Sequence, residues 1–366
     1  PPKTPTPIPI GLVGWDMFIR HSIYDVTFFE KNDWIGGHTH TVDVERDGIT
    51  YAIDTGFIVF NEWTYPRFLN LLSELNLVHQ KTDMSFSVSC LNTGLEYAGD
   101  NFSTMFAQRY RLLSPNYWRF LYDILKFNHV ATRDLNSGSI MQDLTLGEYL
   151  NNYRFGTLLQ THYLRPMASA IWSSSLDEVN LIPAKFFIRF FKNHGLLSIS
   201  NRPQWFTLPG GSRNYIDPLV HAYKSSIHLK TEVTSVVRNI SSVDVISSRG
   251  IEKFDGCILG CHTDQSQRLL DASEKTLKVA LNCIPYASNN VVLHTESAQM
   301  PVSNRAWASW NYRLDQRLIS QGAVVTYFMN KLQNLKGPHQ FFVTLNNTGA
   351  IDPKKIIGQW TYEHPQ

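Results

Sequence analysis

The stretch VTFFEKNDWIGGHTHTV, from Val26 to Val42, contains the residues best suited to bind a nucleotide. Glu30 ends a run of β-favouring residues, and Gly36-Gly37 follows a few positions later. A carboxylate at the end of the second strand of a β-α-β unit accepts hydrogen bonds from the ribose hydroxyls of an adenine nucleotide. Glycines lack side chains and let the backbone approach a phosphate closely. These residue types and their spacing predict one half of a nucleotide-binding site.

The other half of such a site is a G-x-G-x-x-G turn between the first strand and its helix. The sequence offers PIGLVG, in which Gly11 and Gly14 match the second and third glycines and Pro9 replaces the first. Further prolines stand upstream, where a buried strand is expected, and proline cannot donate to a strand ladder. Taken alone, the pattern fits a proline-rich tail followed by a short helix at least as well.

The elements that must position these residues follow from hydrophobic periodicity. Residues 24–30 predict a buried parallel strand, and residues 65–77 predict an amphipathic helix with Leu71 and Leu72 on its apolar face. Residues 115–191 are mainly helical in pattern, and short β segments follow from residue 227 onward. Because β-α-β material returns after a helical block, we expect an α/β fold in which the chain leaves a nucleotide-binding domain and comes back.

Local signals predict finer features at four places along the chain. Residues 92–94 suit the turn of a hairpin, and Thr145 with Glu148 predicts a helix-capping box. Gly195 is expected to end a helix, and residues 265–281 are expected to form another one.

The segments after Glu30 resemble the flavin-containing amine oxidase superfamily, and most closely the FAD-binding oxidoreductases associated with cyclopropane-fatty-acid synthases. The resemblance is carried by FFEKNDWIGGHTHTV, YAIDTGFIVFN, GLEYAG, LRPMASAIWSSS, WFTLPGGSRNYIDPL, LHTESAQMP and YEHP. It runs from about residue 24 to the end of the sequence. It implies a Rossmann-like FAD-binding domain interleaved with an α+β substrate domain. The implied FAD-binding domain covers 1–80 and 200–265, with 346–366 returning to it, and the implied substrate or cap domain covers 81–199 and 266–345.

The same resemblance implies a set of FAD-contacting residues. Glu30 would bind the adenosine ribose, the two glycines after it would face the pyrophosphate, and Val233 would present its backbone to the adenine. The chain around Asp54 would turn beneath the flavin ring, and residues 209–212 would pack beside the cofactor. The full expected set is Gly11, Gly14, Glu30, Lys31, Gly36, Gly37, His38, Thr39, Asp54, Thr55, Gly56 and Val233.

The function implied by the resemblance is that of an FAD-dependent oxidoreductase. It would take a hydride from a C–H bond of an apolar or lipid-like small molecule, but the sequence identifies no catalytic acid or base. The damaged first glycine turn, and the end of the sequence at Gln366 before the family's glycine-rich C-terminal segment, support a second reading. That reading is a catalytically inactive or truncated paralogue that acts as an interaction protein. A NAD(P)-linked dehydrogenase would rest on Glu30 alone.

Composition narrows the class of protein. With a net charge of +2 over 366 residues, nothing in the composition favours a nucleic-acid partner. No apolar run is long enough to cross a bilayer, and four cysteines in this length favour a reducing compartment, so we expect a cytoplasmic protein. The oligomeric state is left open.

Histidine, cysteine and tryptophan side chains offer less specific signals. His38 and His40 would face one side of a strand, but no partner cluster accompanies them, so no metal site is expected. The cysteines are expected to be buried free thiols, and they are Cys90, Cys257, Cys261 and Cys283. Three tryptophans could line a desolvated pocket but are expected more often to pack in the core, and they are Trp205, Trp307 and Trp310.

Overall fold

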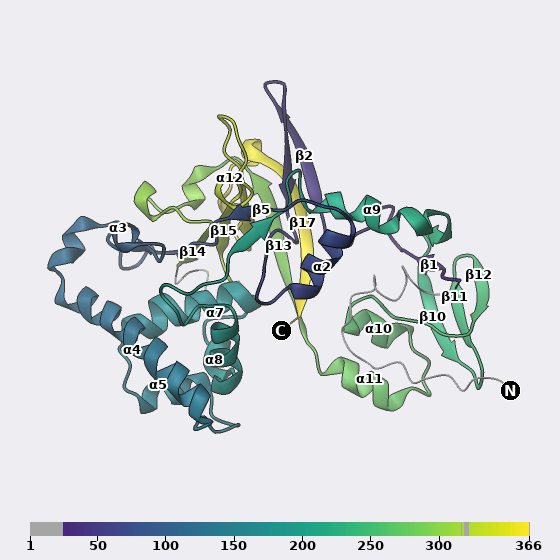
Figure 1. Cartoon of the computed structure of the whole chain (residues 1–366), viewed down its shortest axis with the longest axis horizontal. Helices are drawn as coiled ribbons and strands as arrows, with labels where there is room; N and C mark the ends of the chain where they lie inside the picture. Colours follow the sequence, from purple (N-terminus) through teal and green to yellow (C-terminus); the bar gives the residue numbers. More distant parts are fainter. Residues whose placement is uncertain (1–24, 316, 318–321, 366) are drawn as a thin grey trace.

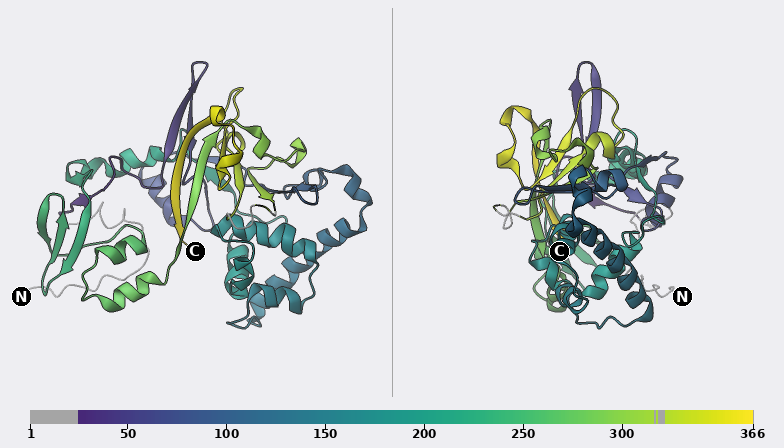
Figure 2. Two further views of the ribbon diagram at one scale, coloured as in Figure 1. Left: turned by 180° about the vertical axis from the view of Figure 1, so that it is seen from behind. Right: turned by 90° about the vertical axis from the view of Figure 1, so that its left-hand side faces the viewer.

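The computed structural model of the chain describes residues 25–315, 317 and 322–365. A large sheet stands at its centre, with a helical region on one side and a smaller β-rich lobe on the other (Figure 1). The views in Figure 2 place the helical region and this lobe at opposite ends of the molecule. The architecture is therefore mixed α/β, as the sequence predicts.

The central sheet has seven strands in the order β17-β13-β16-β15-β14-β6-β7, and only the β14–β6 pair is parallel. Most residues of its middle strands β15 and β16, and the second half of β13, are buried. The strand bounds are β6 Phe86–Cys90, β7 Leu95–Ala98, β13 Tyr286–His294, β14 Trp310–Leu314, β15 Val325–Phe328, β16 Phe342–Leu345 and β17 Ile356–Pro365.

Smaller sheets flank the large one. Two of these sheets build the β-rich lobe. One is a parallel pair of β1 Phe28–Phe29 and β9 Ile227–His228. The other is an antiparallel sheet of β10 Val233–Arg238, β11 Val243–Ser247 and β12 Gly250–Phe254. A hairpin and a short three-stranded sheet lie next to the central sheet, and they are β2 Thr41–Arg46 with β3 Ile49–Asp54, and β4 Phe60–Asn61 with β8 Trp205–Thr207 and β5 Gln80–Thr82.

The helical region and the connecting turns complete the described chain. The α-helices are α2 Pro66–Glu74, α3 Phe102–Met105, α4 Pro115–Ser137, α5 Leu146–Asn152, α6 Thr157–Leu159, α7 Arg165–Trp172, α8 Ala184–Asn193, α9 Ile216–Val220, α10 Thr263–Leu269, α11 Lys275–Asn282 and α12 Met329–Leu332. A π-helical turn covers Gln160–Leu164, and the 3₁₀ turns are η1 Arg109–Leu113, η3 Glu178–Leu181, η4 Ser212–Tyr215, η5 His221–Ser226, η6 Ser297–Gln299, η7 Asn304–Ala306, η9 Thr348–Ala350 and η10 Pro353–Lys355. In the described residues, no helix has the length and apolar character needed to cross a bilayer.

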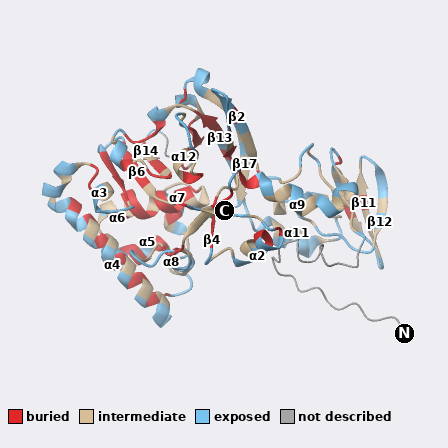
Figure 3. Ribbon diagram, turned by 45° about the horizontal axis from the view of Figure 1, so that its top comes forward, coloured by how far each residue is buried: buried red, intermediate tan, exposed pale blue. Residues whose placement is uncertain are grey.

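The main hydrophobic core lies between the helices and the β6–β7 edge of the central sheet (Figure 3). Helix α4 begins at Pro115, where Ser114 caps it by accepting a hydrogen bond from the Tyr117 amide. It ends at Gly138, whose φ of 69° is readily adopted only by glycine. Helix α8 contributes Phe187 and Phe191, whose stacked rings lie 4.1 Å apart in this core.

Several local predictions are confirmed by the structure. The segment after Cys90 turns back to pair β6 with β7, and Thr145 and Glu148 form a reciprocal capping box at the start of α5. Gly195 directly follows His194, the C-cap residue of α8. Its φ of 70° is that expected for a glycine that ends a helix. Leu71 and Leu72 are the buried side chains of α2.

Other predictions require correction. The expected helix at 265–281 is two helices, because Leu270 is extended and the Asp271 side chain accepts a hydrogen bond from Ser273 N in a turn between them. The strand expected at 24–30 is reduced to β1, which is parallel as predicted but only half-buried.

The cysteine prediction is right only for Cys90. The three other thiols are exposed rather than buried, because two lie in the loop after β12 and one ends α11, a helix without a buried side chain, and they are Cys257, Cys261 and Cys283.

His294 in β13 makes the stability of the central sheet dependent on pH. Its fully buried ring bonds Thr344 Oγ1 at 2.7 Å and accepts from the Glu296 amide, and burial lowers its pKa to about 4. The unfolded chain, with a histidine pKa near 6.5, therefore takes up the proton first as the pH falls. Stability is complete above about pH 6.5 and declines toward pH 4, with a loss of about 1 kcal/mol between pH 7 and 5.5 in urea unfolding.

The variant His294→Asn should show a smaller pH dependence over that window, whatever its absolute stability. His129→Asn, at an exposed position, should keep the wild-type difference. An unchanged pH slope in His294→Asn would show that this imidazole does not titrate as described.

Candidate functional site

The candidate site begins where β1 ends beside β9. Both backbone groups of Glu30 are used there: its amide donates to His228 O at 2.9 Å and its carbonyl accepts from Thr231 N at 2.8 Å. Its side-chain Oε1 accepts from Asn32 N at 2.8 Å, and the side chain is half-buried. A carboxylate has two acceptor oxygens, so this geometry leaves Oε2 available for a further donor.

The strand expected to face an adenine starts next to this carboxylate. Thr231, which bonds Glu30, lies two residues before Val233, the first residue of β10. Lys31 and Glu232 form an ion pair of 2.9 Å between the same two segments. The structure thus brings Glu30, Lys31 and Val233 together, although they are about 200 positions apart in the chain.

The double glycine forms a tight turn after this carboxylate. Gly36 and Gly37 have φ values of 120° and 55°, a region that strongly favours glycine, and Thr39 N bonds Gly36 O at 2.9 Å. A Cβ on Gly37 would have no heavy atom within 4 Å, whereas one on Gly36 would contact the Ile216 side chain. The backbone at Gly37 is therefore open to an incoming group.

The histidine run after the glycines is joined to the turn that follows β3. Phe57 N donates to His38 O and Thr55 N donates to His40 O, both at 2.9 Å. A Cβ on Gly56 would lie 2.1 Å from the His38 carbonyl oxygen, so the close approach of these two segments requires glycine. The run itself lies just before β2 and is not part of a strand.

Aromatic and imidazole rings gather around His38. Its ring centroid lies 5.3 Å from that of His262 and 5.0 Å from that of Tyr362 in β17. The pKa of His38 is lowered below its ordinary value, mainly because the ring is partly buried and further because of electrostatic repulsion from His262 and His364. At neutral pH this imidazole is therefore uncharged and can both donate and accept a hydrogen bond.

Hydrogen bonds connect the same group of rings to the turn after β3. Tyr362 OH bonds Thr55 Oγ1 at 2.9 Å and lies 3.1 Å from His40 Nδ1, which bonds Thr55 Oγ1 at 2.7 Å. Thr39 is buried and bonds Tyr215 OH. Tyr362 was not among the residues predicted from the sequence, although the YEHP segment that contains it carries part of the family resemblance.

Asp54 forms a buried clamp rather than an exposed ligand. Its Oδ1 accepts from Thr41 Oγ1 at 2.6 Å and from Ser212 N at 2.9 Å, and its Oδ2 accepts from Gln333 Nε2 at 2.8 Å. Burial raises the pKa of Asp54 to about 6, against the lowering effect of these hydrogen bonds, so the carboxyl group is ionised at neutral pH.

Gly211 allows the clamp to close. Its φ is 92°, and a Cβ there would lie 2.4 Å from Thr41 Cγ2. The clamp fixes the turn at 209–212 against the end of β3. Gln333, which also accepts from the Asp54 amide at 2.9 Å, has no local sequence signal.

The three tryptophans pack against apolar side chains. Trp205 and Trp310 lie against the core beneath the central sheet, and the Trp310 and Tyr327 ring centroids are 4.8 Å apart. Trp307 contacts Phe328 edge-to-face at 5.5 Å and donates to a backbone carbonyl. The buried Nε1 of Trp310 has no hydrogen-bond partner among the described residues.

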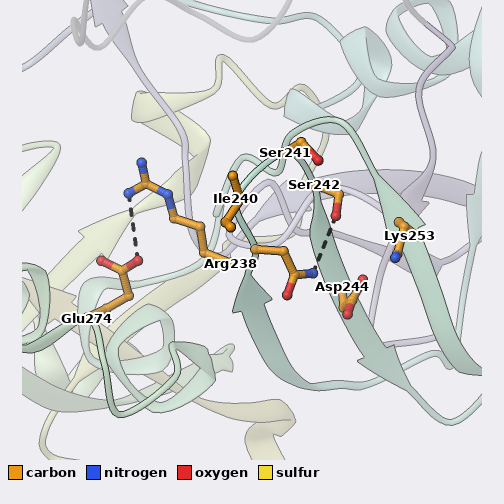
Figure 4. Close-up of a pocket in the computed structure, with 8 residues that line it drawn as sticks. Arg238, Ile240, Ser241, Ser242, Asp244, Lys253 and Glu274 are labelled. Atoms are coloured by element: carbon orange, nitrogen blue, oxygen red, sulfur yellow. Dashed lines mark hydrogen bonds and ion pairs between the residues drawn. The ribbon is translucent and has the colours of Figure 1, made fainter.

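The surface hollow drawn in Figure 4 is separate from the residues around Glu30, His38 and Asp54. That hollow lies at the β10–β11 turn, where Arg238 and Glu274 form a 3.7 Å ion pair and Asn239 donates to Ser242. No cluster of three or more histidine, cysteine or acidic side chains suited to a metal occurs in the described part of the chain. The predicted contacts Gly11 and Gly14 lie outside the described residues.

The chain is similar to known proteins in sequence and in fold. Residues 19–308 match the sequence model of the family described as flavin containing amine oxidoreductase. No curated protein matches the chain. Among solved structures, the fold is similar to that of a CLA-producing fatty acid isomerase from P. acnes, with a TM-score of 0.61, 13% identity, and coverage of 93% of this chain and 80% of that one.

Two oxidases have similar folds. Cyclohexylamine oxidase from Brevibacterium oxydans IH-35A has a TM-score of 0.61 at 12% identity, covering 92% of this chain and 78% of that one. Wild-type putrescine oxidase, solved with putrescine bound, has a TM-score of 0.59 at 13% identity, covering 93% of this chain and 80% of that one. At these identities the likeness concerns the fold alone.

Proposed function

Because the chain belongs to the flavin-containing amine oxidoreductase family, we propose that it oxidises a C–H bond of an apolar or lipid-like small molecule with FAD as cofactor. The family is flavin-containing, and FAD is its cofactor. The observation that carries the proposal is the position of Glu30 at the end of β1, beside the start of β10 and before the open backbone of Gly37.

The residues present fit the adenosine diphosphate half of FAD. The Glu30 carboxylate is an acceptor suited to two ribose hydroxyls. Val233 begins β10 two residues after Thr231, whose amide bonds the Glu30 carbonyl, so its backbone is our proposed contact for the adenine. The positive-φ turn at Gly36-Gly37 leaves space where a pyrophosphate must approach the chain. His38 and Thr39 follow at the position for the ribityl chain or phosphates.

When bound, FAD supplies the redox chemistry by accepting the hydride that leaves the substrate carbon. The protein's part is to hold the cofactor and the substrate in place and to exclude water. The neutral His38 ring can bond an oxygen of the cofactor's middle section without adding a charge. The Asp54 clamp keeps the turn at 209–212 and the turn after β3 in one arrangement.

An apolar substrate is supported by the comparison of folds rather than by a pocket of the described residues. One protein of similar fold is a fatty acid isomerase. We also propose the discontinuous division in which 1–80, 200–265 and 346–366 bind FAD and 81–199 with 266–345 form the substrate or cap domain.

Replacing Glu30 with alanine should weaken FAD binding by about 1–3 kcal/mol, roughly 5- to 150-fold in Kd, because a charged acceptor of ribose hydrogen bonds is lost. The purified full chain and the variant would be titrated with FAD and followed by flavin fluorescence. The oxidation of apolar amines and of fatty acids can then be assayed with the FAD-loaded wild-type protein.

Glu232→Ala is the matched control, since Glu232 is an exposed acid in the adjoining segment and pairs only with Lys31 in the described structure. It should bind FAD nearly as tightly as the wild type. Equal affinity for wild type and Glu30→Ala would remove this carboxylate from the site.

A further inference from the structure

The outer end of the helical region exposes a set of large apolar side chains. They belong to α3, η1 and the first three turns of α4. The helices α3 and α4 lie at the end of the molecule opposite the β-rich lobe (Figures 1 and 3). Their exposed fractions range from 38% to 89%, with Leu113 the most exposed. We call this set the α3–α4 apolar patch, and its members are Phe102, Tyr110, Leu112, Leu113, Trp118, Tyr122 and Leu125.

Three members of the patch are held around one buried ring. Phe102 and Trp118 both contact the fully buried Phe106, at 4.7 Å and 5.1 Å between ring centroids, and Trp118 Nε1 donates to Leu112 O. Tyr122 lies one helical turn after Trp118 on the same face of α4, and Leu125 follows it. The side chains therefore form one surface rather than scattered exposed residues.

Positive charges outnumber negative ones around the patch. Residues 100–122 contain three arginines and one acid, Asp100, which is exposed and accepts a hydrogen bond from Asn101 Nδ2. Arg109 donates to Ser103, Arg111 donates to Gln108, and no ion pair in the described structure involves these two residues or Arg119. Asp123, the next acid in the chain, is buried and accepts from Gly156 N, so it does not offset this charge at the surface.

We propose that the α3–α4 apolar patch docks on a lipid bilayer surface that carries anionic headgroups. Tryptophan and tyrosine suit the boundary between headgroups and acyl chains, where one end of the ring is apolar and the other is hydrated. Leu113 and Phe102 would enter the acyl boundary, and the three arginines would lie against phosphates and other anionic groups. The patch is formed by two helices and a 3₁₀ turn whose side chains are exposed, which suits insertion into a lipid surface.

This attachment is peripheral. No helix of the described residues could cross the membrane, and α4 has a buried face of its own in the protein core. Docking would bring the helical region to a membrane surface, where apolar molecules accumulate. The proposal does not depend on cofactor binding, so it can fail or succeed independently of the proposed function.

The test uses the full chain and sedimentation with vesicles of phosphatidylcholine, with and without phosphatidylglycerol. Binding is expected to both, stronger with phosphatidylglycerol, and weakened by high salt only in the anionic case. Leu113→Glu should lower the partition coefficient about tenfold or more, because an inserted leucine is replaced by a charge. Arg119→Glu should lower binding only to the anionic vesicles.

Matched controls come from exposed positions outside the patch. Ile240→Glu replaces an exposed apolar residue in the β10–β11 turn of the β-rich lobe, and Lys354→Glu replaces an exposed cation, so both should bind vesicles as the wild type does. Thermal unfolding of each variant establishes that it is folded. The proposal is wrong if the wild type does not bind either vesicle, or if Leu113→Glu and Ile240→Glu bind equally.

A protein partner is the main rival occupant. If the wild type forms an oligomer that Leu113→Glu converts to monomers, while neither protein binds vesicles, the patch is an interface between copies of the chain and the lipid proposal is overturned.

Discussion

Replacing Asp54 with alanine is expected to lower the free energy of unfolding by about 3–5 kcal/mol. The side chain is fully buried and accepts hydrogen bonds from Thr41, Ser212 and Gln333. Without the carboxylate these donors are buried and unsatisfied, and each costs free energy. Urea unfolding followed by circular dichroism would measure the loss.

Asp43→Ala provides the control for a nearby acid. Asp43 pairs with Arg213 at 2.6 Å, but both side chains are close to half exposed, so its loss should cost less than about 1 kcal/mol. If the two aspartate variants lose the same stability, Asp54 does not act as a clamp.

The second large effect is expected at the glycine that follows the clamp. Gly56→Ala places a Cβ 2.1 Å from the His38 carbonyl oxygen, which is backbone and cannot rotate away. The turn after β3 must move away from the histidine run. The hydrogen bonds that the Thr55 and Phe57 amides donate to carbonyl groups of that run are then strained or lost. We expect a loss of about 3 kcal/mol in unfolding free energy and weaker FAD binding.

The control for this substitution is Gly256→Ala. Gly256 also has a φ outside the left-handed region, and a Cβ there would have nothing within 4 Å. Its replacement should leave stability within about 0.5 kcal/mol of the wild type. If Gly56→Ala is as stable as Gly256→Ala, the close approach to His38 is not a constraint on the fold.

Features that depend on neighbouring residues were predictable from the sequence. The capping box at Thr145 and Glu148, the turn after Cys90 and the glycine that ends α8 involve residues within a few positions of one another. The family resemblance supplied the fold class, because motifs spread over most of the chain are hard to match by chance. The parallel pairing of β1 also followed from its apolar run.

Contacts between distant segments were not predictable in the same way. Gln333 bonds Asp54 across 279 positions, and Tyr362 bonds Thr55 across 307. Single residues of these types carry no pattern that reveals a partner in another element. The cysteine prediction was wrong for a related reason: residue type favours burial, but Cys257, Cys261 and Cys283 lie in a loop and at the end of a helix with no buried side chain.

The candidate site combines features set by neighbouring residues with contacts between distant segments. The spacing of Glu30 and Gly36-Gly37 predicts a nucleotide half-site, and this stays a prediction. The structure shows that the Thr231 amide, two residues before Val233, bonds the Glu30 carbonyl. The surroundings of His38, formed by His262 and Tyr362, come from two other parts of the chain. Its lowered pKa could therefore only be described from the structure.

The central claim is that the segment from Glu30 to Thr39 binds the adenosine diphosphate portion of FAD. Its most direct test is an equilibrium titration of the purified full chain with FAD, followed by the visible flavin spectrum after removal of free cofactor. We expect saturable binding of one FAD per chain, with the bound flavin displaced by excess ADP-ribose. Failure of the chain to retain any flavin, or retention that ADP-ribose does not affect, would contradict it.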